Sequence, residues 1–215
     1  METIGKAELP GLFEQLRDTF ATQRDFLIEL DGKVGDSDLG LTMNKAFQAA
    51  YETVAANEAD SVGRTLQLAG MAIAKAAPST MGTLMATGFM RGGKALESAT
   101  VIGSAELSLF WGAFLVGVSE RGKAKPGDKT LVDVLEPIAT AVYVAAGAGM
   151  PLPIVAALAL RAASEGLEAT KGMVAQHGKA ACFQEKTLGL QDAGATVGYF
   201  LAAAMHRYIA ETQAA

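Results

Sequence analysis

The sequence predicts an all-α protein, a single domain (residues 1–215) of about eight helices whose neighbours run antiparallel. Apolar residues recur at three- and four-residue spacing along most of the chain, as they do on one face of a helix. Runs of β-branched residues with a period of two are nearly absent, so we expect no sheet. The helical patterns are joined mostly by short connections, which places sequential helices side by side in an up-and-down order.

The first helical pattern covers residues 8–30. Its apolar residues keep the spacing of one helix face: Leu9, Leu12, Phe13, Leu16, Phe20, Leu27 and Leu30. Further helical patterns cover residues 40–57, 60–77, 80–98, 104–121, 129–147, 152–171 and 192–213. Abundant Ala and Gly on these segments allow the helices to approach closely, and nine Met residues can fill irregular gaps.

Composition limits the class of protein. Half of the 215 residues are hydrophobic, 19% are charged and the mean hydropathy is +0.25, so a large core can be buried. A net charge of −5 argues against a general nucleic-acid binder, which would normally carry a basic face. The lone Cys182 excludes an internal disulfide, and the first ten residues lack an apolar signal core. Both features indicate a cytoplasmic protein.

The longest uncharged stretch lies between Glu136 and Arg161 and could in length cross a bilayer. Its middle carries four residues that end helices or turn the chain: Gly147, Gly149, Pro151 and Pro153. Two buried helices joined by a turn are therefore predicted, and we expect no membrane span.

Residues 31–40, DGKVGDSDLG, gather Asp31, Asp36 and Asp38 in one glycine-rich loop. Like charges this close repel one another, which indicates a missing positive partner. Carboxylates are hard oxygen ligands, and Mg²⁺ takes one or two of them beside phosphate oxygens and water. The spacing thus suits one ion, or two ions sharing a ligand. The alternative is an Asp-rich turn in which Asp38 caps the next helix.

Residues 77–88, APSTMGTLMATG, form a second unusual connection. Pro78 ends one helix and Ser79 or Thr80 can cap the next. Gly82 would leave the backbone N–H groups of the first turn accessible. A helix N-terminus of this kind can bind phosphate or another anion. An ordinary capped turn between helices explains the same residues.

The densest basic cluster lies in RGKAKPGDKT, residues 121–130: Arg121, Lys123, Lys125 and Lys129. Such a run is usually a solvated loop, here turned by Pro126 and Gly127. Alternatively, a positive loop that faces a carboxylate, metal and phosphate cluster would supply charge where phosphoryl transfer develops it.

Residues 172–191 form a long connection without a clear period, and loops of this length are often functional or mobile. We expect this segment to be the most mobile part of the protein without ligand. Asp192, Gly194 and Thr196 then open the last helix with another capping, anion-compatible start.

Four of these connections should meet at one end of the bundle. They cover residues 31–40, 78–82, 121–130 and 172–191 and follow the first, third, fifth and seventh helices. In an antiparallel bundle, connections after odd-numbered helices share one end. We therefore expect a single site for metal and nucleotide phosphate there.

These loops resemble signature segments of the nucleotide-binding L subunit, or L domain, of dihydroxyacetone kinases. The family loop D-x4-D-x-D-H-G is matched by Asp31, Asp36, Asp38 and Gly40. RGKAKPGDKTLVDVLEPI is similar to the family's RGKAxPGDKTMxD, and LGLQDAGAT is similar to GHQDPGAT. The intervening lengths also agree, so the likeness spans nearly all of residues 10–213. The chain is identified as a divergent member of this family.

The resemblance implies a barrel of eight antiparallel helices with ADP or ATP at one end. Two Mg²⁺ ions would be held by Asp31, Asp36 and Asp38. Phosphates would be lined by Thr80 and Met81, and the adenosine or its ribose by the later loops. The positions carried over for the nucleotide are Leu39, Gly40, Thr42, Ser79, Thr80, Met81, Gly82, Gly122, Leu131, Lys179, Asp192, Ala193 and Gly194.

The implied activity is phosphoryl transfer to dihydroxyacetone or a related small ketose. In such kinases a separate K-type subunit or domain holds the sugar through a covalent bond to its histidine. We expect His177 on the loop surface and His206 within the last helix, so neither matches the histidine that holds the sugar. Acid–base help for the sugar hydroxyl would come from the partner, and no catalytic base is assigned to this chain. The phosphoryl source would be exchangeable ATP, or bound ADP recharged by a phosphohistidine protein of the phosphotransferase system.

The chain departs from the family pattern around the nucleotide. The family's His after the third Asp is Leu39, its nearby Asn is Thr42, its late-loop Arg is Lys179 and the Pro of its DPGA is Ala193. Its Gly-Gly-x-Ser-Gly phosphate loop reads PSTMG at residues 78–82.

Two functions remain open from the sequence. The intact aspartates favour an enzyme subunit that supplies the phosphoryl group. Leu39 and Met81 favour a non-catalytic regulatory module that binds nucleotide and metal and interacts with a partner protein.

Overall fold

The computed structural model describes residues 2–57 and 61–212. Within these residues the α-helices are α1 (Leu9–Thr22), α2 (Arg24–Gly32), α3 (Leu39–Ala55), α4 (Val62–Ala76), α5 (Thr80–Ala95), α6 (Ser104–Gly122), α7 (Val132–Gly147), α8 (Leu152–Ala169) and α9 (Ala193–Glu211). Three short 3₁₀ helices accompany them: η1 (Lys6–Glu8), η2 (Thr170–Gly172) and η3 (Ala180–Thr187).

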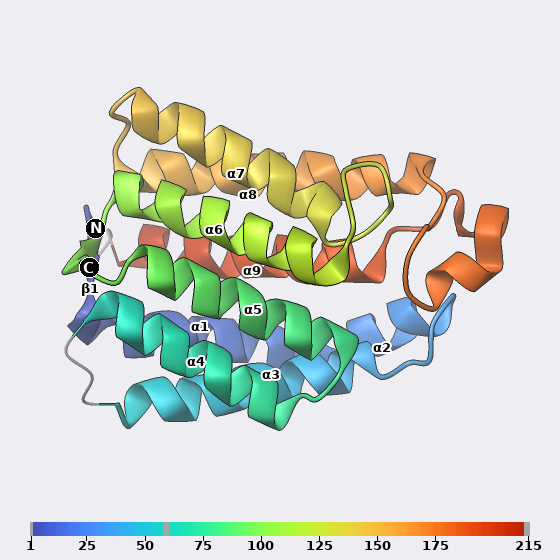
Figure 1. Cartoon of the computed structure of the whole chain (residues 1–215), viewed down its shortest axis with the longest axis horizontal. Helices are drawn as coiled ribbons and strands as arrows, with labels where there is room; N and C mark the ends of the chain where they lie inside the picture. Colours follow the sequence, from blue (N-terminus) through green and yellow to red (C-terminus); the bar gives the residue numbers. More distant parts are fainter. Residues whose placement is uncertain (1, 58–60, 213–215) are drawn as a thin grey trace.

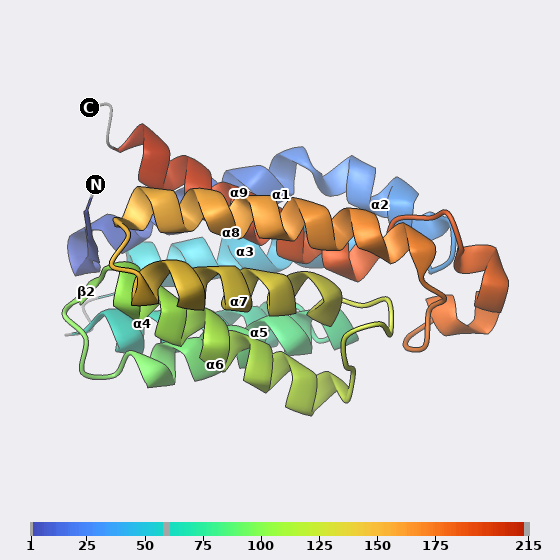
Figure 2. The same cartoon turned by 90° about the horizontal axis from the view of Figure 1, so that it is seen from above.

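The long helices form a closed barrel of antiparallel neighbours (Figure 1, Figure 2). From α3 to α9, each helix packs against the next one along the chain. Helix α1 packs against both α3 and α9 and so closes the ring. Because α1 and α2 form one bent rod, the barrel has eight walls within the described residues. The predicted all-α class and eight-helix barrel are confirmed.

The first wall bends at Gln23, where the sequence predicts one helix over residues 8–30. Backbone hydrogen bonds continue across the bend, from Gln23 N–H to Thr19 O at 2.9 Å and from Leu27 N–H to Gln23 O at 3.0 Å. The Thr19 hydroxyl also donates to the Gln15 carbonyl oxygen at 2.8 Å. Hydroxyl groups that bond back to the preceding turn often bend helices, which gives this bend a physical cause.

Most other boundaries agree with the predicted ranges to within three residues. The helix predicted from residue 129 begins at Val132, because Lys129 has a φ of 59°, a left-handed conformation that an α-helix excludes. The helix predicted to reach residue 171 ends at Ala169 and continues as η2. The predicted helix ends at residues 60 and 213 lie outside the described residues.

The prediction that the chain has no sheet needs one small correction. Strand β1 (Ile4–Gly5) pairs antiparallel with β2 (Val101–Ile102), and Ile4 lies opposite Ile102. Both isoleucine side chains are buried. Two residues per strand are too few to produce a period-two pattern. The pairing fastens the start of the chain to the connection between α5 and α6.

Aromatic side chains fill part of the barrel interior. The Phe89 ring lies within 5.5 to 6.0 Å, centroid to centroid, of the rings of Phe13, Phe47, Phe110 and Phe114. All five side chains are buried. Tilted and edge-on contacts of this kind contribute beyond their buried area. They fix the helices that carry the loops at the barrel ends.

The uncharged stretch folds as the predicted helical hairpin. Helices α7 and α8 pack against each other. The chain turns between them through Gly149, which has a φ of 70°. None of the helices in the described part of the chain is long and apolar enough to span a membrane.

We expect Gly63→Ala to lower the free energy of unfolding by about 1–3 kcal/mol. A Cβ at Gly63 would lie 2.5 Å from Gly93 O and 2.4 Å from Leu96 O, so α4 and α5 would have to separate. Gly112→Ala is the matched control, because nothing lies within 4 Å of its Cβ position. That variant should gain up to about 1 kcal/mol from helix propensity. Urea unfolding measures both, and equal effects would contradict the packing argument.

Candidate functional site

The barrel carries a cavity of about 760 Å³ at the end opposite β1 and β2. At this end the α2–α3 loop, the α4–α5 turn, the α6–α7 loop and the 172–191 segment come together (Figure 1). The cavity wall contains most of the predicted site positions: Asp31, Asp36, Asp38, Leu39, Thr42, Ser79, Thr80, Met81, Gly122, Leu131, Lys179, Asp192, Ala193 and Gly194. The up-and-down topology thus brings the four predicted loops to one place.

Two predicted positions, Gly40 and Gly82, lie behind the cavity wall rather than in it. A Cβ at Gly40 would lie 2.0 Å from Arg24 O, and a Cβ at Gly82 would lie 2.0 Å from Ala77 O. Both glycines therefore permit close approach of backbone to backbone. Their role in the structure is packing next to the site.

The three aspartates converge as predicted, Asp31 from the last turn of α2 and Asp36 and Asp38 from the connection between α2 and α3. One carboxylate oxygen from each of Asp31, Asp36 and Asp38 lies within 4.8 Å of the others. Asp31 is half-buried and the other two are exposed. A Cβ at Gly35 would lie 2.1 Å from Asp31 Oδ1, so the chain can pass this carboxylate only without a side chain. The loop offers a cation several oxygen ligands at once.

Helix α3 is capped by Asp31, although the sequence suggests Asp38 as an alternative cap. Asp31 Oδ2 accepts the N–H groups of Asp38 at 3.0 Å and Leu39 at 3.3 Å. Asp38 occupies the N-cap position, but its side chain makes no capping bond. Ser37, with a φ of 61°, turns the chain into this arrangement. The Asp38 carboxylate is thus not needed to cap the helix.

Lys179 supplies positive charge to the trio. Its ammonium group forms a salt bridge with Asp36 Oδ2, although 143 residues separate the two in sequence. Within the described residues this is the one salt bridge that the trio makes. The 172–191 segment therefore reaches across the cavity to the acidic loop.

The start of α5 forms the wall beside the acidic loop. Ser79 Oγ caps the helix, as expected, and accepts the Gly82 N–H at 3.0 Å. Of the first-turn N–H groups that we expected to be accessible, the N–H of Gly82 is therefore occupied. The N–H groups of Thr80 and Met81 have no partner among the described residues. Both residues line the cavity. Free N–H groups at a helix N-terminus favour an anion.

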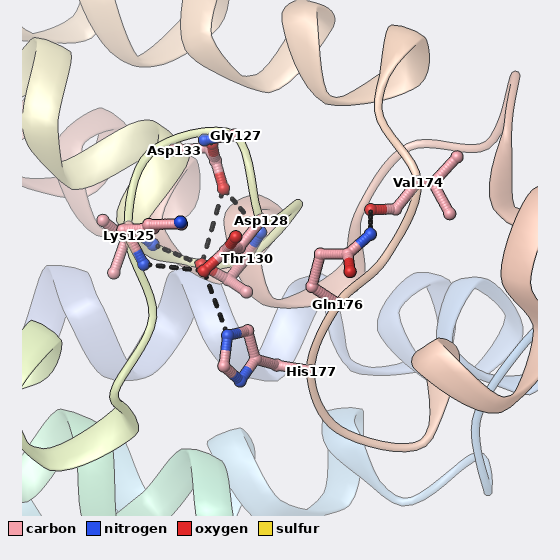
Figure 3. A network of polar contacts seen from close by, with 9 residues as sticks. Lys125, Gly127, Asp128, Thr130, Asp133, Val174, Gln176 and His177 are labelled. Atoms are coloured by element: carbon pink, nitrogen blue, oxygen red, sulfur yellow. Dashed lines mark hydrogen bonds and ion pairs between the residues drawn. The ribbon is translucent and has the colours of Figure 1, made fainter.

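Asp133, in the first turn of α7, folds the loop of residues 126–130. Its Oδ1 accepts the Gly127 N–H at 2.6 Å and its Oδ2 accepts the Thr130 N–H at 2.7 Å (Figure 3). Lys129, the basic residue between these two contacts, is therefore held in a fixed backbone and is not in a freely solvated loop.

Asp128 joins the same loop to the 172–191 segment (Figure 3). Its Oδ2 accepts the Lys125 N–H at 2.9 Å and lies 3.0 Å from His177 Nε2, while its carbonyl oxygen accepts the Gln176 N–H at 3.0 Å. The hydrogen bond from Lys125, followed by that from His177, holds the pKa of Asp128 below its usual range. Asp128 is thus a buried carboxylate that links two loops.

Lys129 lies inside the protein. Its side chain is buried, and its ammonium group donates to Thr170 O and Leu190 O, both at 2.6 Å. Burial lowers its pKa, while the charge of Asp192 acts in the opposite direction. Of the four basic residues in this region, only Lys129 belongs to the cavity wall, and its ammonium group contacts two backbone carbonyl oxygens and not the acidic cluster. The other three lie outside the wall: Arg121, Lys123 and Lys125. The contacts of the described residues therefore do not support a positive loop that faces the acidic cluster.

His177 lies in a loop and is partly exposed, as expected, but it also belongs to the cavity wall. Its side chain is 37% exposed, faces the cavity and contacts Asp128. His206 lies within α9 as expected. A lone histidine in a loop without periodicity gives no local signal of its partner, so only the fold could place it.

The structure adds cavity residues that sequence reasoning missed. They are Val34, Gly35, Pro78, Leu84, Val118, Ala124, Thr130, Val132, His177, Gly178, Ala180 and Cys182. Leu84 lies four residues after Thr80 and Val118 four residues before Gly122, so both share a helix face with a predicted position. Helical spacing could have identified these two.

The cavity wall contains both polar and apolar groups. Carboxylates and free helix N–H groups belong to it together with the apolar side chains of Leu84, Val118 and Leu131. A ligand that fits both has an anionic group, which a metal ion can bridge to the carboxylates, and a less polar body. Nucleotides have this combination.

Fold and cavity together define an all-α barrel protein with an acidic loop and an anion-compatible helix N-terminus at one end. The DAK2 domain family model matches residues 33–207. This match covers most of the chain, and the protein therefore belongs to the DAK2 domain family.

Two relatives illustrate the range of sizes in the family. The chain is 29% identical over 199 residues to the "PEP-dependent dihydroxyacetone kinase, ADP-binding subunit DhaL" of Escherichia coli K12, covering 93% of this chain and 95% of that protein. It is 33% identical over 196 residues to the "L-erythrulose 1-kinase" of Mycolicibacterium smegmatis, covering 86% of this chain but 32% of that protein.

Solved structures give the same fold. The native dihydroxyacetone kinase of C. freundii matches with a TM-score of 0.72 and 25% identity, over 94% of this chain and 34% of that chain. The structure of that kinase with AMP-PNP and Mg²⁺ matches with a TM-score of 0.71 at 24% identity. The chain therefore spans about a third of the C. freundii kinase.

Asp192 offers a pH-dependent test of the site. It caps α9 by accepting the Ala195 N–H at 2.6 Å. Burial raises its pKa to about 6, against the opposing effects of that hydrogen bond and of Lys129. Because the folded state binds this proton more tightly than the unfolded chain, the stabilisation is complete below the unfolded pKa near 3.8 and is lost as pH rises through 6.

We therefore expect the stability of the protein relative to Asp192→Asn to fall by up to about 3 kcal/mol between pH 4 and pH 7.5. Asparagine keeps the helix cap and removes the titration. Urea unfolding across this pH range measures the difference, and a constant difference would contradict the raised pKa.

A second test concerns mobility. Residues 172–191 should exchange their amide hydrogens faster than the barrel helices when no ligand is bound, because much of the segment lies at the surface. Hydrogen–deuterium exchange with peptide resolution measures this. Protection equal to that of α5 would show that the contacts of Asp128 and Lys129 make the whole segment rigid.

Proposed function

We propose that residues 1–215 form one domain that acts as the ADP- or ATP-binding subunit of a kinase for dihydroxyacetone or a related small ketose. The observation that supports this most is the convergence of three aspartates within 4.8 Å beside a helix N-terminus with free N–H groups. The likeness to subunits named ADP-binding in E. coli and Listeria innocua supports ADP as a ligand. The erythrulose kinases among the relatives support a small ketose.

The donor set fits Mg²⁺. Asp31, Asp36 and Asp38 provide only oxygen ligands, and phosphate oxygens would complete the coordination. We propose that these three aspartates hold two Mg²⁺ ions. Bound Mg²⁺ would neutralise charge on the phosphates that it bridges.

The remaining residues would bind and orient the nucleotide. The N–H groups of Thr80 and Met81 suit a phosphate oxygen, and Leu39 and Thr42 lie close by in the wall formed by α3. Gly122, Leu131 and the turn at residues 192–194 would surround the adenosine or ribose. Leu131 is apolar and lies in the cavity wall, which suits a nucleoside next to it.

Acid–base chemistry on the sugar would come from a partner. We propose a K-type subunit that holds the ketose, so this chain would position the phosphoryl group at the cavity mouth. The named PEP- and PTS-dependent relatives support a phosphohistidine protein of the phosphotransferase system as the donor that recharges bound ADP. Exchangeable ATP is the other source.

One observation favours a non-catalytic regulatory module that binds nucleotide and metal. Met81 Cε lies 3.0 Å from the Cβ position of Gly194, so this thioether fills space between the starts of α5 and α9. A bulky side chain there would leave less space for phosphate beside the N–H groups of Thr80 and Met81. Binding without turnover is therefore the alternative function.

We expect Asp36→Asn to weaken Mg²⁺-dependent ADP binding by at least about tenfold, because a metal ligand loses its charge. Asp25→Asn is the matched control, since Asp25 is exposed on α2 and pairs with Arg24 outside the cavity. Calorimetry with and without Mg²⁺ measures both. Unchanged ADP binding in Asp36→Asn would refute the metal assignment.

Enzyme and regulatory module are separated by two measurements. Mass spectrometry of the gently denatured protein should release ADP or ATP. Incubation with a K-type partner, dihydroxyacetone and a phosphoryl source should then give phosphorylated sugar. Nucleotide release without product would support the regulatory module, and the absence of both would refute the proposed function.

A further inference from the structure

Residues 176–179, here called the strap, connect two loops on opposite sides of the cavity. At one end, the Gln176 N–H donates to Asp128 O and His177 Nε2 lies 3.0 Å from Asp128 Oδ2 (Figure 3). At the other end, Lys179 forms its salt bridge with Asp36. Gly178, with a φ of 64°, makes the turn between the two contacts.

The two ends differ in strength. Asp128 is buried, and its carboxylate accepts one further hydrogen bond, from the Lys125 N–H. By contrast, the side chains of Lys179 and Asp36 are 64% and 41% exposed. Exposed ion pairs contribute little and exchange readily. The His177 end is therefore the fixed end, and the Lys179 end is the one that can release.

We propose that Lys179 takes the place of a divalent cation at Asp36 and that metal binding displaces it, which releases this end of the strap. The inference rests on the proposed metal site. Three carboxylates carry three negative charges, and Lys179 offsets one of them in the metal-free protein. This explains how the trio stays within 4.8 Å although its members repel one another.

Competition follows from charge and distance. A Mg²⁺ ion bound to Asp36 would sit about 2.1 Å from its carboxylate oxygen. The ammonium group of Lys179 contacts the same carboxylate, so the two cations would lie close together and repel each other. A divalent ion gains more from the trio than a lysine does and replaces it. The released ammonium is then free to turn toward phosphate, while Asp128 still holds the strap.

Mn²⁺ binding to the nucleotide-free protein, followed by the electron paramagnetic resonance signal of free Mn²⁺, tests the competition. Lys179→Gln should bind Mn²⁺ about three- to fivefold more tightly than the unsubstituted protein. Lys179→Arg keeps the charge and should bind as the unsubstituted protein does. Lys186→Gln is the matched control, because Lys186 is exposed on the same segment and lies outside the cavity wall.

The outcomes distinguish this inference from the metal site itself. Equal Mn²⁺ affinity for Lys179→Gln and the unsubstituted protein, with binding lost in Asp36→Asn, would overturn the displacement and leave the site standing. Mn²⁺ binding that does not change in Asp36→Asn would overturn both.

Amide exchange gives a readout that is independent of affinity. Mg²⁺ without nucleotide should speed exchange at residues 178–180 severalfold and leave Gln176 protected by Asp128. Lys179→Gln should show the fast exchange before Mg²⁺ is added. Unchanged or slower exchange on addition of Mg²⁺ would overturn the proposal.

Discussion

The carboxylate of Asp31 is the contact on which the candidate site depends. It accepts two N–H groups at the start of α3 and so fixes the return of the loop that carries Asp36 and Asp38. A negative charge at a helix N-terminus is favourable, so one member of a repelling trio is stabilised by its own backbone. The acidic cluster is thus built into the folded chain and does not have to be assembled by a ligand.

Buried ionic groups attach the rest of the site to the barrel. Asp128 and Lys129 are adjacent in sequence. Asp128 contacts His177, whereas Lys129 donates to Thr170 O and Leu190 O, which lie near the two ends of the 172–191 segment. Such groups are costly to bury unless they are paired and hydrogen-bonded. Their satisfaction explains how a segment rich in short 3₁₀ turns is held over a cavity. It also links the conformation of that segment to the α6–α7 loop.

The spacing of apolar residues was sufficient to predict the helices. In an antiparallel bundle, connections after odd-numbered helices share one end, and this was sufficient to predict that four loops meet. Features that depend on distant partners were not predictable. The cap of α3 comes from Asp31, seven residues before Asp38, the cap that the alternative interpretation of this loop proposes. The side chain of Lys129 turns inward because its backbone is left-handed and its ammonium group donates hydrogen bonds to two backbone carbonyl groups. His177 joins the cavity through a carboxylate 49 residues away. None of these partners leaves a periodic trace in the sequence.

The pairing of β1 with β2 has a practical consequence. It holds residues 4 and 5 at the barrel end where α9 also finishes, remote from the acidic loop (Figure 1). With 19 residues, α9 alone spans roughly 28 Å at 1.5 Å per residue. A linker added near either end of the chain would therefore tether the protein to a sensor chip or a bead with its mouth facing the solution. Surface-based measurement of partner capture would then be free of steric obstruction from the support.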